Sequence, residues 1–526
     1  MTAYAKVSRT TDTPRIEFPE QYNAAVEFID KHIQQGRADN LALIDGNGSY
    51  RYGELAQRVN RAGNMLRQLG LEMEQRVALC LLDTVDFPTL FWGAMKAGAV
   101  AVPLNTLLTS DDYAFMLRDS RAKVLVVSAA LYEKFAPVIE QQPFLQQVIV
   151  AGGEIPGTRC LDTLLAQASP VLEPAPTSPD DVGFWLYTSG STGKPKGAVH
   201  LHRDLIYTAE YYGSGVLGLR ADDLIFSAAK LFFAYGLGNA MTFPLYVGAS
   251  AVLLAERPAP AAVMQILQEH QPTVFFGVPT LYAGMLADPA NCRDTGSPRL
   301  RLCASAGEPL PVETARRWEE RFGVPILDGI GSTEMLHIFL SNTPADYRYG
   351  TTGKPIPGYG LRVVDEQGEP VAPGEIGELL VDGLSAAVTY WNRREKSRAT
   401  FQGRWTCTGD KYSVDEDGYY TYCGRSDDML KVSGHWVSPF DVESALIAHP
   451  QVLEAAVVGQ ADEHKLIKPK ALVVLQDADL ASTALAEELQ NFVKQRLAPY
   501  KYPRWIEFVD GLPKTATGKI QRFKLR

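Results

Sequence analysis

The sequence predicts an α/β protein with a large N-terminal domain of α/β subdomains, whose sheets are mostly parallel, and a smaller α+β C-terminal domain. Over roughly 300 residues, short apolar runs rich in β-branched residues alternate with segments of helical spacing, the pattern of sheets covered by helices on both faces. The pattern of apolar runs and turn residues then changes twice toward the C-terminus, near residue 349 and again after residue 424. We therefore expect an N-terminal domain over residues 1–426, a small β-barrel-like subdomain within it near 349–422, and a C-terminal domain over 427–526.

Strands of the large domain are expected where apolar residues run without alternation, because such strands are buried on both faces. These runs are residues 77–82, 123–128, 250–255, 273–277 and 301–305. Helices are expected between them, for example over 204–217 and 260–270, where apolar residues recur at helical spacing.

Beyond residue 349 the expected elements are shorter and richer in strands. Gly and Pro turns separate short alternating strands up to residue 422. The stretch GRSDDMLKVSG, residues 424–434, leads into the last domain. There we expect a helix over 439–448, apolar strands at 452–459 and 470–475, and a helix over 480–497.

Composition and charge exclude several classes of protein. Hydrophobic residues make up 46% and charged residues 21%, as in ordinary globular proteins. The net charge of −10 argues against a nucleic-acid partner or an anionic membrane partner. No apolar run approaches the ~20 residues of a membrane span, and the N-terminus lacks a signal-peptide stretch, so a cytoplasmic location is expected. The six cysteines have no metal-ligand spacing and are expected to be reduced.

The densest local motif is YTSGSTGKPKGAVH, residues 187–200, which follows the apolar run VGFWL. Its glycines allow backbone amides to face a polyanion, while its hydroxyls and lysines add charge-assisted hydrogen bonds. It is not a Walker A loop, because Thr188 stands where that motif needs glycine. The plain alternative is a flexible Gly/Ser surface loop. The context after an apolar run favours a phosphate-binding loop.

The string YTSGSTGKPKG resembles the signature loop of the adenylate-forming enzymes, a superfamily of acyl-CoA and aryl-CoA synthetases, luciferases and peptide-synthetase adenylation domains. Further motifs of that superfamily occur in the same order: SAGEPL at 305–310, DGIGSTE at 328–334, TGD at 408–410, GRSDDMLKVSG at 424–434 and PKTATGK at 513–519. The resemblance spans nearly the whole chain. It implies activation of a carboxylic acid with ATP and Mg²⁺, followed by transfer to coenzyme A.

The resemblance also implies which residues bind the nucleotide. The β- and γ-phosphates would contact Thr188, Ser189, Gly190, Ser191, Thr192, Gly193 and Lys196. The adenine would lie against Ala306, Gly307, Glu308, Asp328, Gly329 and Ile330, although the family usually has an aromatic residue in place of Ile330. Thr333 would touch the α-phosphate, and Glu334 with Thr188 would hold Mg²⁺, which prefers oxygen ligands.

Three more charged residues take roles from the resemblance. Asp410 would accept the ribose hydroxyls, since a carboxylate offers only acceptors, with Arg425 beside it. Lys519 would be the catalytic cation, because adenylation brings two anions together and a fixed ammonium offsets their repulsion. It lies in a basic stretch, residues 491–526, which has nine Lys or Arg against Glu507 and Asp510. A solvated surface role suits Lys524 better, because no motif surrounds it.

The resemblance implies that the C-terminal domain is mobile and rotates between the two half-reactions. The hinge would be Asp427, in a loop between domains. After rotation, the coenzyme A tunnel would be lined by Lys431, Ser433, Gly434, His435 and Trp436. His435 is either a base for the thiol or an ordinary surface histidine.

The acid-binding pocket is expected around Ala234, Tyr235, Gly236, His337 and Ile338. Neither Ala234 nor Tyr235 balances an ammonium, which argues against an amino-acid substrate. A small residue beside a flat aromatic suits an unsubstituted aryl acid. The stretches LFFAYGLGNAMTFPL and DGIGSTEMLHIF look most like the benzoate-activating branch, so benzoate is the expected substrate. Phe232 and Phe233 are alternatively plain core residues.

Several alternatives remain open at this point. Another small aryl acid such as 2-aminobenzoate, or a fluorobenzoate, would fit the same pocket, and a stand-alone carrier protein would accept the acyl group in place of coenzyme A. Luciferase-like chemistry is not excluded by motif. A non-catalytic nucleotide-binding regulator is disfavoured, because Lys519 and Glu334 are both present. We expect a monomer or homodimer that acts in aromatic compound catabolism.

Overall fold

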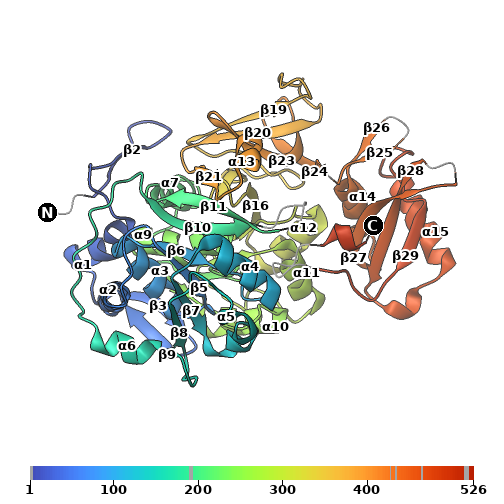
Figure 1. Cartoon of the computed structure of the whole chain (residues 1–526). Helices are drawn as coiled ribbons and strands as arrows, with labels where there is room; N and C mark the ends of the chain where they lie inside the picture. Colours follow the sequence, from blue (N-terminus) through green and yellow to red (C-terminus); the bar gives the residue numbers. More distant parts are fainter. Residues whose placement is uncertain are drawn as a thin grey trace.

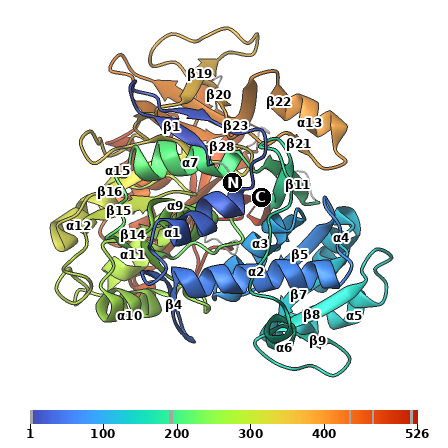
Figure 2. The ribbon, with the colours of Figure 1, turned by 90° about the vertical axis from the view of Figure 1, so that its left-hand side faces the viewer.

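The computed structural model describes residues 4–188, 194–426, 428–432, 435–463, 466–514 and 520–525. It shows a large N-terminal domain and a small C-terminal domain beside it (Figure 1). In Figure 2, which views the molecule from its left-hand end in Figure 1, the C-terminal domain lies behind the large one. The described helices are too short or too polar to span a lipid bilayer.

The first sheet of the large domain has the strand order β21-β11-β10-β6-β5-β7-β8-β9. Its parallel part runs from β10 to β9, and β11 and β21 extend one edge in the antiparallel sense. The strands are β5 (Arg76–Cys80), β6 (Val100–Pro103), β7 (Val124–Ser128), β8 (Gln147–Ala151), β9 (Arg159–Cys160), β10 (Val182–Thr188), β11 (Lys196–Leu201) and β21 (Thr389–Tyr390).

The second sheet has the order β18-β17-β16-β15-β14-β12-β13-β3-β4 and is parallel from β16 to β3. Its strands are β3 (Leu41–Asp45), β4 (Gly48–Arg51), β12 (Leu224–Ser227), β13 (Ser250–Val252), β14 (Val274–Gly277), β15 (Leu302–Ser305), β16 (Ile326–Gly331), β17 (Ile338–Ser341) and β18 (Lys354–Pro355). The predicted mostly parallel α/β architecture is confirmed.

Both sheets are buried on both faces, as the continuous apolar runs predict. In β5, Val77 and Leu79 join a central core with α2 (Tyr52–Gln68) and α3 (Asp86–Lys96), whereas Ala78 and Cys80 pack with α4 (Ser110–Ser120) on the other face. The second sheet sends alternate residues to the same central core and, on its outer face, to α10 (Pro260–His270), α11 (Pro279–Ala287) and α12 (Val312–Phe322). One core therefore joins the two sheets.

Short helices complete the large domain, and several of them line its central core. They are η1 (Val26–Asp30), α1 (Lys31–Gln34), α5 (Ala136–Ile139), α6 (Leu161–Gln167), α7 (Asp204–Thr208), η3 (Ala209–Ser214), α8 (Ala234–Leu237), η4 (Gly238–Thr242) and α9 (Phe243–Val247). The helix expected over 204–217 is thus α-helical at first and then π-helical in η3. An N-terminal hairpin of β1 (Lys6–Ser8) and β2 (Arg15–Glu17) is fixed by Arg9, which donates two hydrogen bonds to buried Glu210.

A third, antiparallel sheet lies above the first two in Figure 1. It consists of β19 (Tyr359–Val364), β20 (Gly377–Gly383), β22 (Phe401–Gln402), β23 (Trp405–Val414) and β24 (Tyr420–Arg425), with α13 (Arg394–Thr400) beside it. This sheet occupies the region expected to be β-rich. The domain boundaries near residue 427 stay a prediction.

The C-terminal domain packs two helices against a sheet ordered β27-β28-β29. Its elements are β25 (Leu430–Val432), β26 (His435–Val437), α14 (Pro439–Ile447), β27 (Val452–Ala461), β28 (Ile467–Leu475), α15 (Thr483–Lys494) and β29 (Trp505–Phe508), with short turns η5 (Ala478–Leu480) and η6 (Arg522–Lys524). Buried Glu443 accepts hydrogen bonds from Val457 N–H and from Arg522, which ties the last turn to the domain.

The contact between α2 and α3 requires glycine, and this gives a stability prediction. A Cβ on Gly93 would lie 2.6 Å from Ala62 Cβ and 3.0 Å from the Val59 carbonyl oxygen. Alanine in an uncrowded helix stabilises by about 1 kcal/mol. Gly93→Ala should instead destabilise by about 1–3 kcal/mol through overpacking, seen as a lower apparent Tm. Gly46→Ala, at a glycine with no atom near its Cβ, is the control. An unchanged Tm for Gly93→Ala contradicts the packing argument.

Candidate active site

Two antiparallel strands carry the ends of the expected phosphate loop. Thr188 ends β10 and lies directly opposite Lys196, which begins β11. The buried apolar residues of β10 fix this hairpin in the first sheet, and Tyr187 donates a 2.9 Å hydrogen bond to Asp119. Ser189, Gly190, Ser191, Thr192 and Gly193 lie outside the described residues.

Lys196 meets an aromatic ring and a carboxylate from two other segments. Ala198 of β11 pairs with Tyr390 of β21, so Lys196, two residues earlier, shares a face with Tyr390. The Lys196 ammonium lies 4.2 Å from the Tyr390 ring centroid, and the Tyr390 hydroxyl donates a 2.5 Å hydrogen bond to Glu334 Oε1. Burial lowers the pKa of Lys196, while the nearby Glu334 raises it. Sequence reasoning missed Tyr390, which stands in no charged or glycine-rich motif.

The backbone of Thr333 is held by a buried histidine. His200 Nε2 donates a 2.8 Å hydrogen bond to the Thr333 carbonyl, since a carbonyl only accepts. On its other side, His200 Nδ1 lies 3.0 Å from Asp204 Oδ2, which also accepts the Leu201 N–H. Burial raises the pKa of Asp204. These two residues also went unnoticed in the sequence, although His200 ends the phosphate-loop motif.

Asp410 and Arg425 form an ion pair across β23 and β24. They are direct partners in the antiparallel register, and Arg425 Nη1 lies 3.0 Å from Asp410 Oδ1. Asp410 is buried. Gly409 has φ +72°, and a Cβ there would stand 3.0 Å from Arg425 Nη2, so the TGD motif needs its glycine. Asp410 is the main cause of a raised pKa for Arg425, and Glu334 adds to it.

The expected adenine residues follow two adjacent parallel strands. Ser305 of β15 pairs with Asp328 of β16, so Ala306, Gly307 and Glu308 emerge at the same sheet edge as residues 328–330. This is the carboxyl edge, where open α/β sheets bind ligands. Gly307 has φ +95°, which favours glycine. Burial raises the pKa of Asp328 well above its usual value, and Asp328 Oδ1 has no hydrogen-bond partner among the described atoms.

The expected acid pocket is assembled from α8, η4 and the start of β17. His337 Nε2 donates a 3.2 Å hydrogen bond to the carbonyl of Tyr235, which lies in α8 with Ala234 and Gly236. Ile338 lies over Gly329, because a Cβ added to Gly329 would come within 3.1 Å of Ile338 Cδ1. The structure therefore brings all five pocket residues into one region next to the adenine-site strand β16.

His337 is neutral and tightly enclosed. Its ring centroid lies 4.5 Å from Phe243, 5.5 Å from Tyr212 and 5.6 Å from Tyr235. A Cβ on Gly238 would be 2.3 Å from the His337 ring, so only glycine allows this approach. Burial lowers the pKa of His337 to about 3. Of the two phenylalanines of uncertain role, Phe232 is buried in the core and Phe233 is partly exposed.

Several buried polar atoms in this region have no partner among the described residues. They are Tyr235 Oη, His337 Nδ1, Ser305 Oγ, and both Oδ1 and Nδ2 of Asn239 in η4. A buried polar group without a hydrogen bond costs about 1–3 kcal/mol, so such a cluster marks a place for a ligand or ordered water. Asn239 was not singled out from the sequence, because a lone amide in an apolar helix gives no motif.

One C-terminal segment lies at the edge of this region. Glu308 Oε1 accepts the Ile520 N–H at 3.0 Å. Ile520 is the residue after Lys519, which itself lies outside the described residues, as does Asp427. A pocket of about 90 Å³ borders the same place and is lined by residues of both domains, among them Glu308, Phe440, Ile520 and Arg522.

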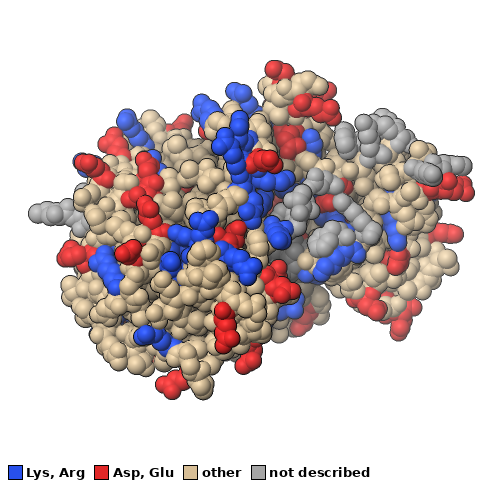
Figure 3. Space-filling view, viewed as in Figure 1, with Lys and Arg blue, Asp and Glu red and all other residues tan. Residues whose placement is uncertain are grey.

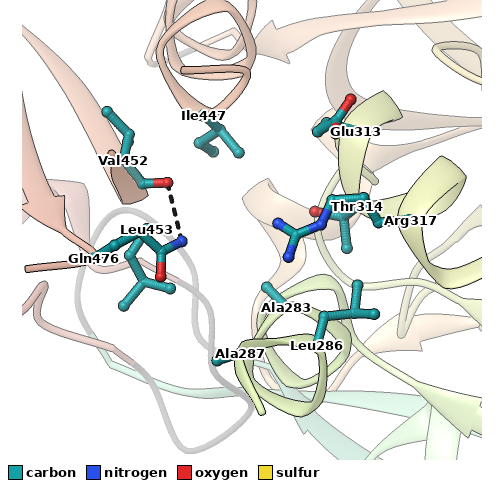
Figure 4. Close-up of a pocket in the computed structure, with 10 residues that line it drawn as sticks. All are labelled: Ala283, Leu286, Ala287, Glu313, Thr314, Arg317, Ile447, Val452, Leu453 and Gln476. Carbon is teal, nitrogen blue, oxygen red and sulfur yellow. Dashed lines mark hydrogen bonds between the residues drawn. The ribbon is translucent and has the colours of Figure 1, made fainter. Parts of the chain in front are cut away.

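A second, smaller pocket of about 30 Å³ lies nearby between the domains (Figure 4). Arg317 and Leu286 face it from the large domain, and Ile447 and Leu453 from the C-terminal domain. Figure 3 shows Lys and Arg side chains gathering on the face where the domains meet. The domain junction is thus partly hollow, and the side chains that line its two pockets carry charges of both signs, among them Glu308, Arg317 and Arg522.

The residues expected to bind coenzyme A lie elsewhere. The backbone of Lys431, His435 and Trp436 belongs to the β25–β26 hairpin, while Ser433 and Gly434 lie outside the described residues. Figure 1 places this hairpin on the C-terminal domain, away from the β10–β11 hairpin. In this arrangement the nucleotide-site residues and the β25–β26 hairpin are apart.

The donor set fits a phosphate-bound Mg²⁺. Among the described residues, no three His, Cys, Asp or Glu side chains converge to hold a metal by themselves. Mg²⁺ needs fewer protein ligands, because it is usually bound by one or two carboxylates together with substrate phosphates and water. Glu334 offers a carboxylate beside Lys196, whose cross-strand partner Thr188 offers a hydroxyl.

The fold and these residues define an enzyme that binds a nucleotide, and comparison with known families agrees. Residues 29–391 match the model of the AMP-binding enzyme family, and residues 441–519 match the AMP-binding enzyme C-terminal domain. The chain belongs to the AMP-binding enzyme family.

Individual relatives cover nearly the whole chain. A benzoate-CoA ligase of Thauera aromatica is 61% identical over 515 residues, covering 98% of this chain and 97% of that protein. A crystal structure of a benzoate CoA ligase from Burkholderia xenovorans LB400 has a TM-score of 0.90 at 52% identity, covering 96% of this chain and all of that one. The anthranilate CoA ligase AuaEII in complex with anthranoyl-AMP has a TM-score of 0.93 at 45% identity, covering 97% of each chain.

The buried neutral His337 predicts a specific pH dependence of stability. The unfolded chain protonates this histidine below pH ~6.5, but the folded chain does so only near pH 3, so the folded state loses stability as pH falls through this window. Between pH 7 and pH 5 the wild type should lose about 2 kcal/mol more than His337→Gln, measured by urea unfolding.

The control for this prediction is His270→Gln, at the partly exposed end of α10. It should unfold with the same pH dependence as the wild type. Equal pH dependence of His337→Gln and the wild type would contradict a neutral, buried His337.

Proposed function

We propose that this chain is an AMP-forming acid-thiol ligase that converts benzoate, ATP and coenzyme A into benzoyl-CoA, AMP and pyrophosphate. The observation that carries the proposal is the meeting of Lys196, Glu334 and the Asp410–Arg425 pair next to the cluster of aromatic rings around His337. The 61% identity with the benzoate-CoA ligase of Thauera aromatica supports the same substrates.

In the first half-reaction, a benzoate oxygen attacks the α-phosphorus of ATP. The bond from this phosphorus to the bridging oxygen of the β-phosphate breaks, and pyrophosphate leaves with that electron pair. Thr188, the loop residues Ser189 to Gly193, and Lys196 would hold the β- and γ-phosphates through hydroxyls, backbone amides and an ammonium. Thr333 would contact the α-phosphate, and its backbone is already fixed by His200.

Glu334 and Thr188 would hold the Mg²⁺ that accompanies ATP. Such a metal neutralises negative charge on the phosphates as a Lewis acid. Asp410 would accept both ribose hydroxyls, while its ion pair with Arg425 orients that carboxylate. The adenine would lie between Ala306–Gly307–Glu308 and Asp328–Gly329–Ile330 at the carboxyl edge of the second sheet.

Lys519 would place its ammonium between benzoate and the α-phosphate. The approach of two anions is costly in a dry site, and a fixed cation offsets it and stabilises the transition state. The Ile520 N–H bond to Glu308 supports this role, because it holds the following residue at the expected adenine site.

The acid pocket supports a small neutral aryl group. His337 is uncharged, and Ala234, Gly236 and Ile338 carry no polar side-chain group, so ring packing dominates binding. The amide of Asn239 and the hydroxyl of Tyr235 are the polar side-chain groups beside this aromatic cluster, and they favour tolerance of one small polar substituent. For this reason 2-aminobenzoate is the second candidate, and the likeness to an anthranilate CoA ligase supports it.

In the second half-reaction, the coenzyme A thiolate attacks the acyl carbonyl and AMP leaves. Lys519 would have to withdraw, and the C-terminal domain would turn about Asp427 to bring Lys431, Ser433, Gly434, His435 and Trp436 to the site. The present distance of the β25–β26 hairpin from the β10–β11 hairpin supports assignment of this arrangement to the adenylation step.

The cellular setting is part of the proposal. ATP and coenzyme A as substrates favour a cytoplasmic enzyme, and activation of an aromatic acid suits aromatic compound catabolism. A monomer or homodimer would suffice, because the residues assigned to both half-reactions come from one chain. Transfer to a carrier-protein thiol is the alternative second step.

A panel of acids tests the substrate class. Coenzyme A-dependent AMP formation should be fastest with benzoate, followed by fluorobenzoates and 2-aminobenzoate. Octanoate should fall behind benzoate by about 100-fold or more in kcat/KM, because an enclosed pocket excludes a long chain. A higher kcat/KM for a medium-chain fatty acid than for benzoate would contradict the assigned substrate class. Acylation of a carrier protein in preference to coenzyme A would support the alternative acceptor.

The lysine variant tests the two-step mechanism. Lys519→Ala should lower benzoyl-AMP formation by about 100-fold or more, because it removes a cation that acts in the transition state. Thioester formation from supplied benzoyl-AMP should be largely unchanged. Both half-reactions are followed in single-turnover experiments.

Lys524→Ala is the matched control, since it removes an exposed lysine five residues further on. It should leave both rates as in the wild type. Equal losses in the two half-reactions of Lys519→Ala would rule out a role confined to adenylation.

A further inference from the structure

We propose that Tyr390 is a positioning residue that keeps Glu334 and Lys196 apart, so that the carboxylate stays available to a metal and the ammonium to phosphate. This inference rests on the proposed nucleotide chemistry of the site. Tyr390 does not contact the reacting atoms of that chemistry. It acts through the two charged residues that it touches.

The position of Tyr390 is fixed by strand pairing. β21 adds to β11 at the edge of the first sheet, with Tyr390 opposite Ala198, and the Trp391 N–H donates a 2.8 Å hydrogen bond to the Gly197 carbonyl. The Tyr390 N–H donates to Ser397 Oγ at 3.0 Å, which ties the strand to α13. Only 3% of Tyr390 is exposed, so its ring has little freedom to move.

Tyr390 uses two different parts of its side chain on two opposite charges. Its hydroxyl donates the 2.5 Å hydrogen bond to Glu334 Oε1, and its ring face lies under the Lys196 ammonium at 4.2 Å. The Glu334 backbone is held separately, because its carbonyl accepts the Ala387 N–H at 2.7 Å. Both charged residues are therefore anchored to the segment 387–391.

The alternative arrangement of these groups is a direct ion pair. Lys196 and Glu334 feel each other's charge, yet they form no salt bridge in the described part of the chain. If they paired, the ammonium would occupy the carboxylate that Mg²⁺ needs, and the carboxylate would neutralise the cation that phosphate needs. With Tyr390 in place, Oε1 is satisfied by a neutral donor and the ammonium rests on a neutral ring.

Tyr390→Phe separates the two contacts, because it removes the hydroxyl and keeps the ring. Binding of Mn²⁺·ATP, measured by calorimetry, should weaken about tenfold, the range for losing a hydrogen bond to a charged group. Binding of AMP without metal should stay within about twofold, since it depends on other residues. Tyr390→Leu also removes the ring and should weaken Mn²⁺·ATP by a further factor of about three.

A double-mutant cycle shows whether Tyr390 works through Glu334. In a Glu334→Gln background, Tyr390→Phe should have almost no further effect on Mn²⁺·ATP binding, because the carboxylate it positions is gone. Additive losses would overturn the proposal. Turnover gives a second reading: Tyr390→Phe should raise the Mg²⁺·ATP KM and leave the benzoate KM unchanged.

Tyr349→Phe is the matched control. The Tyr349 hydroxyl donates a 2.7 Å hydrogen bond to Glu319 on α12, so the variant loses the same kind of bond outside the site. It should bind Mn²⁺·ATP as the wild type does. If Tyr390→Phe also binds as the wild type does, or if it weakens metal-free AMP by the same factor as Mn²⁺·ATP, the proposal is wrong.

An incorrect proposed function would give a different experimental result from an incorrect role of Tyr390. The wild type would then show no benzoate-dependent exchange of labelled pyrophosphate into ATP. The loss of Mn²⁺·ATP binding in Tyr390→Phe does not depend on benzoate, so it would still be observed. The two results therefore separate an incorrect substrate from an incorrect role for Tyr390.

Discussion

The pairing of β21 with β11 is the contact on which the charged part of the site depends. It returns the chain to the first sheet about two hundred residues after β11 and sets Tyr390 opposite Ala198. A shift by one residue would turn Tyr390 to the other face and leave Lys196 without its ring. The same edge carries Thr188 and, through His200, the backbone of Thr333. One antiparallel edge added to a parallel sheet thus positions groups from three distant segments.

Much of the fold could be predicted from the sequence, because strands buried on both faces have continuous apolar runs such as VLVVS in β7. The charged and glycine-rich residues assigned to the site could be proposed from the sequence because their residue types indicate a chemistry, and these assignments stay predictions. Tyr390, His200, Asp204 and Asn239 were not, since their roles arise from strand register and from packing between remote segments. The π-helical turns η3 and η4 also escaped notice, because π and α helices share nearly the same apolar spacing.

The acid pocket and the phosphate region differ in the charge of their side chains. Around the phosphate region, Glu334 raises the pKa of both Lys196 and Arg425, and Asp410 raises the pKa of Arg425 further. In the pocket, burial keeps His337 neutral and leaves several polar atoms unpaired. An aryl carboxylate placed between these regions would lay its ring on the uncharged side and its anionic end on the cationic side. That division would orient the substrate without a charged residue beneath the ring.

The bond from the Ile520 main chain to Glu308 has a consequence for how the C-terminal segment is released. Every residue except proline has a backbone N–H, so a substitution at position 520 keeps this hydrogen bond unless it introduces proline. An amide-to-carboxylate hydrogen bond contributes about 1.5–3 kcal/mol, so thermal motion can open and re-form this main-chain bond. This bond therefore depends on the main chain at position 520 and tolerates a change of side chain there.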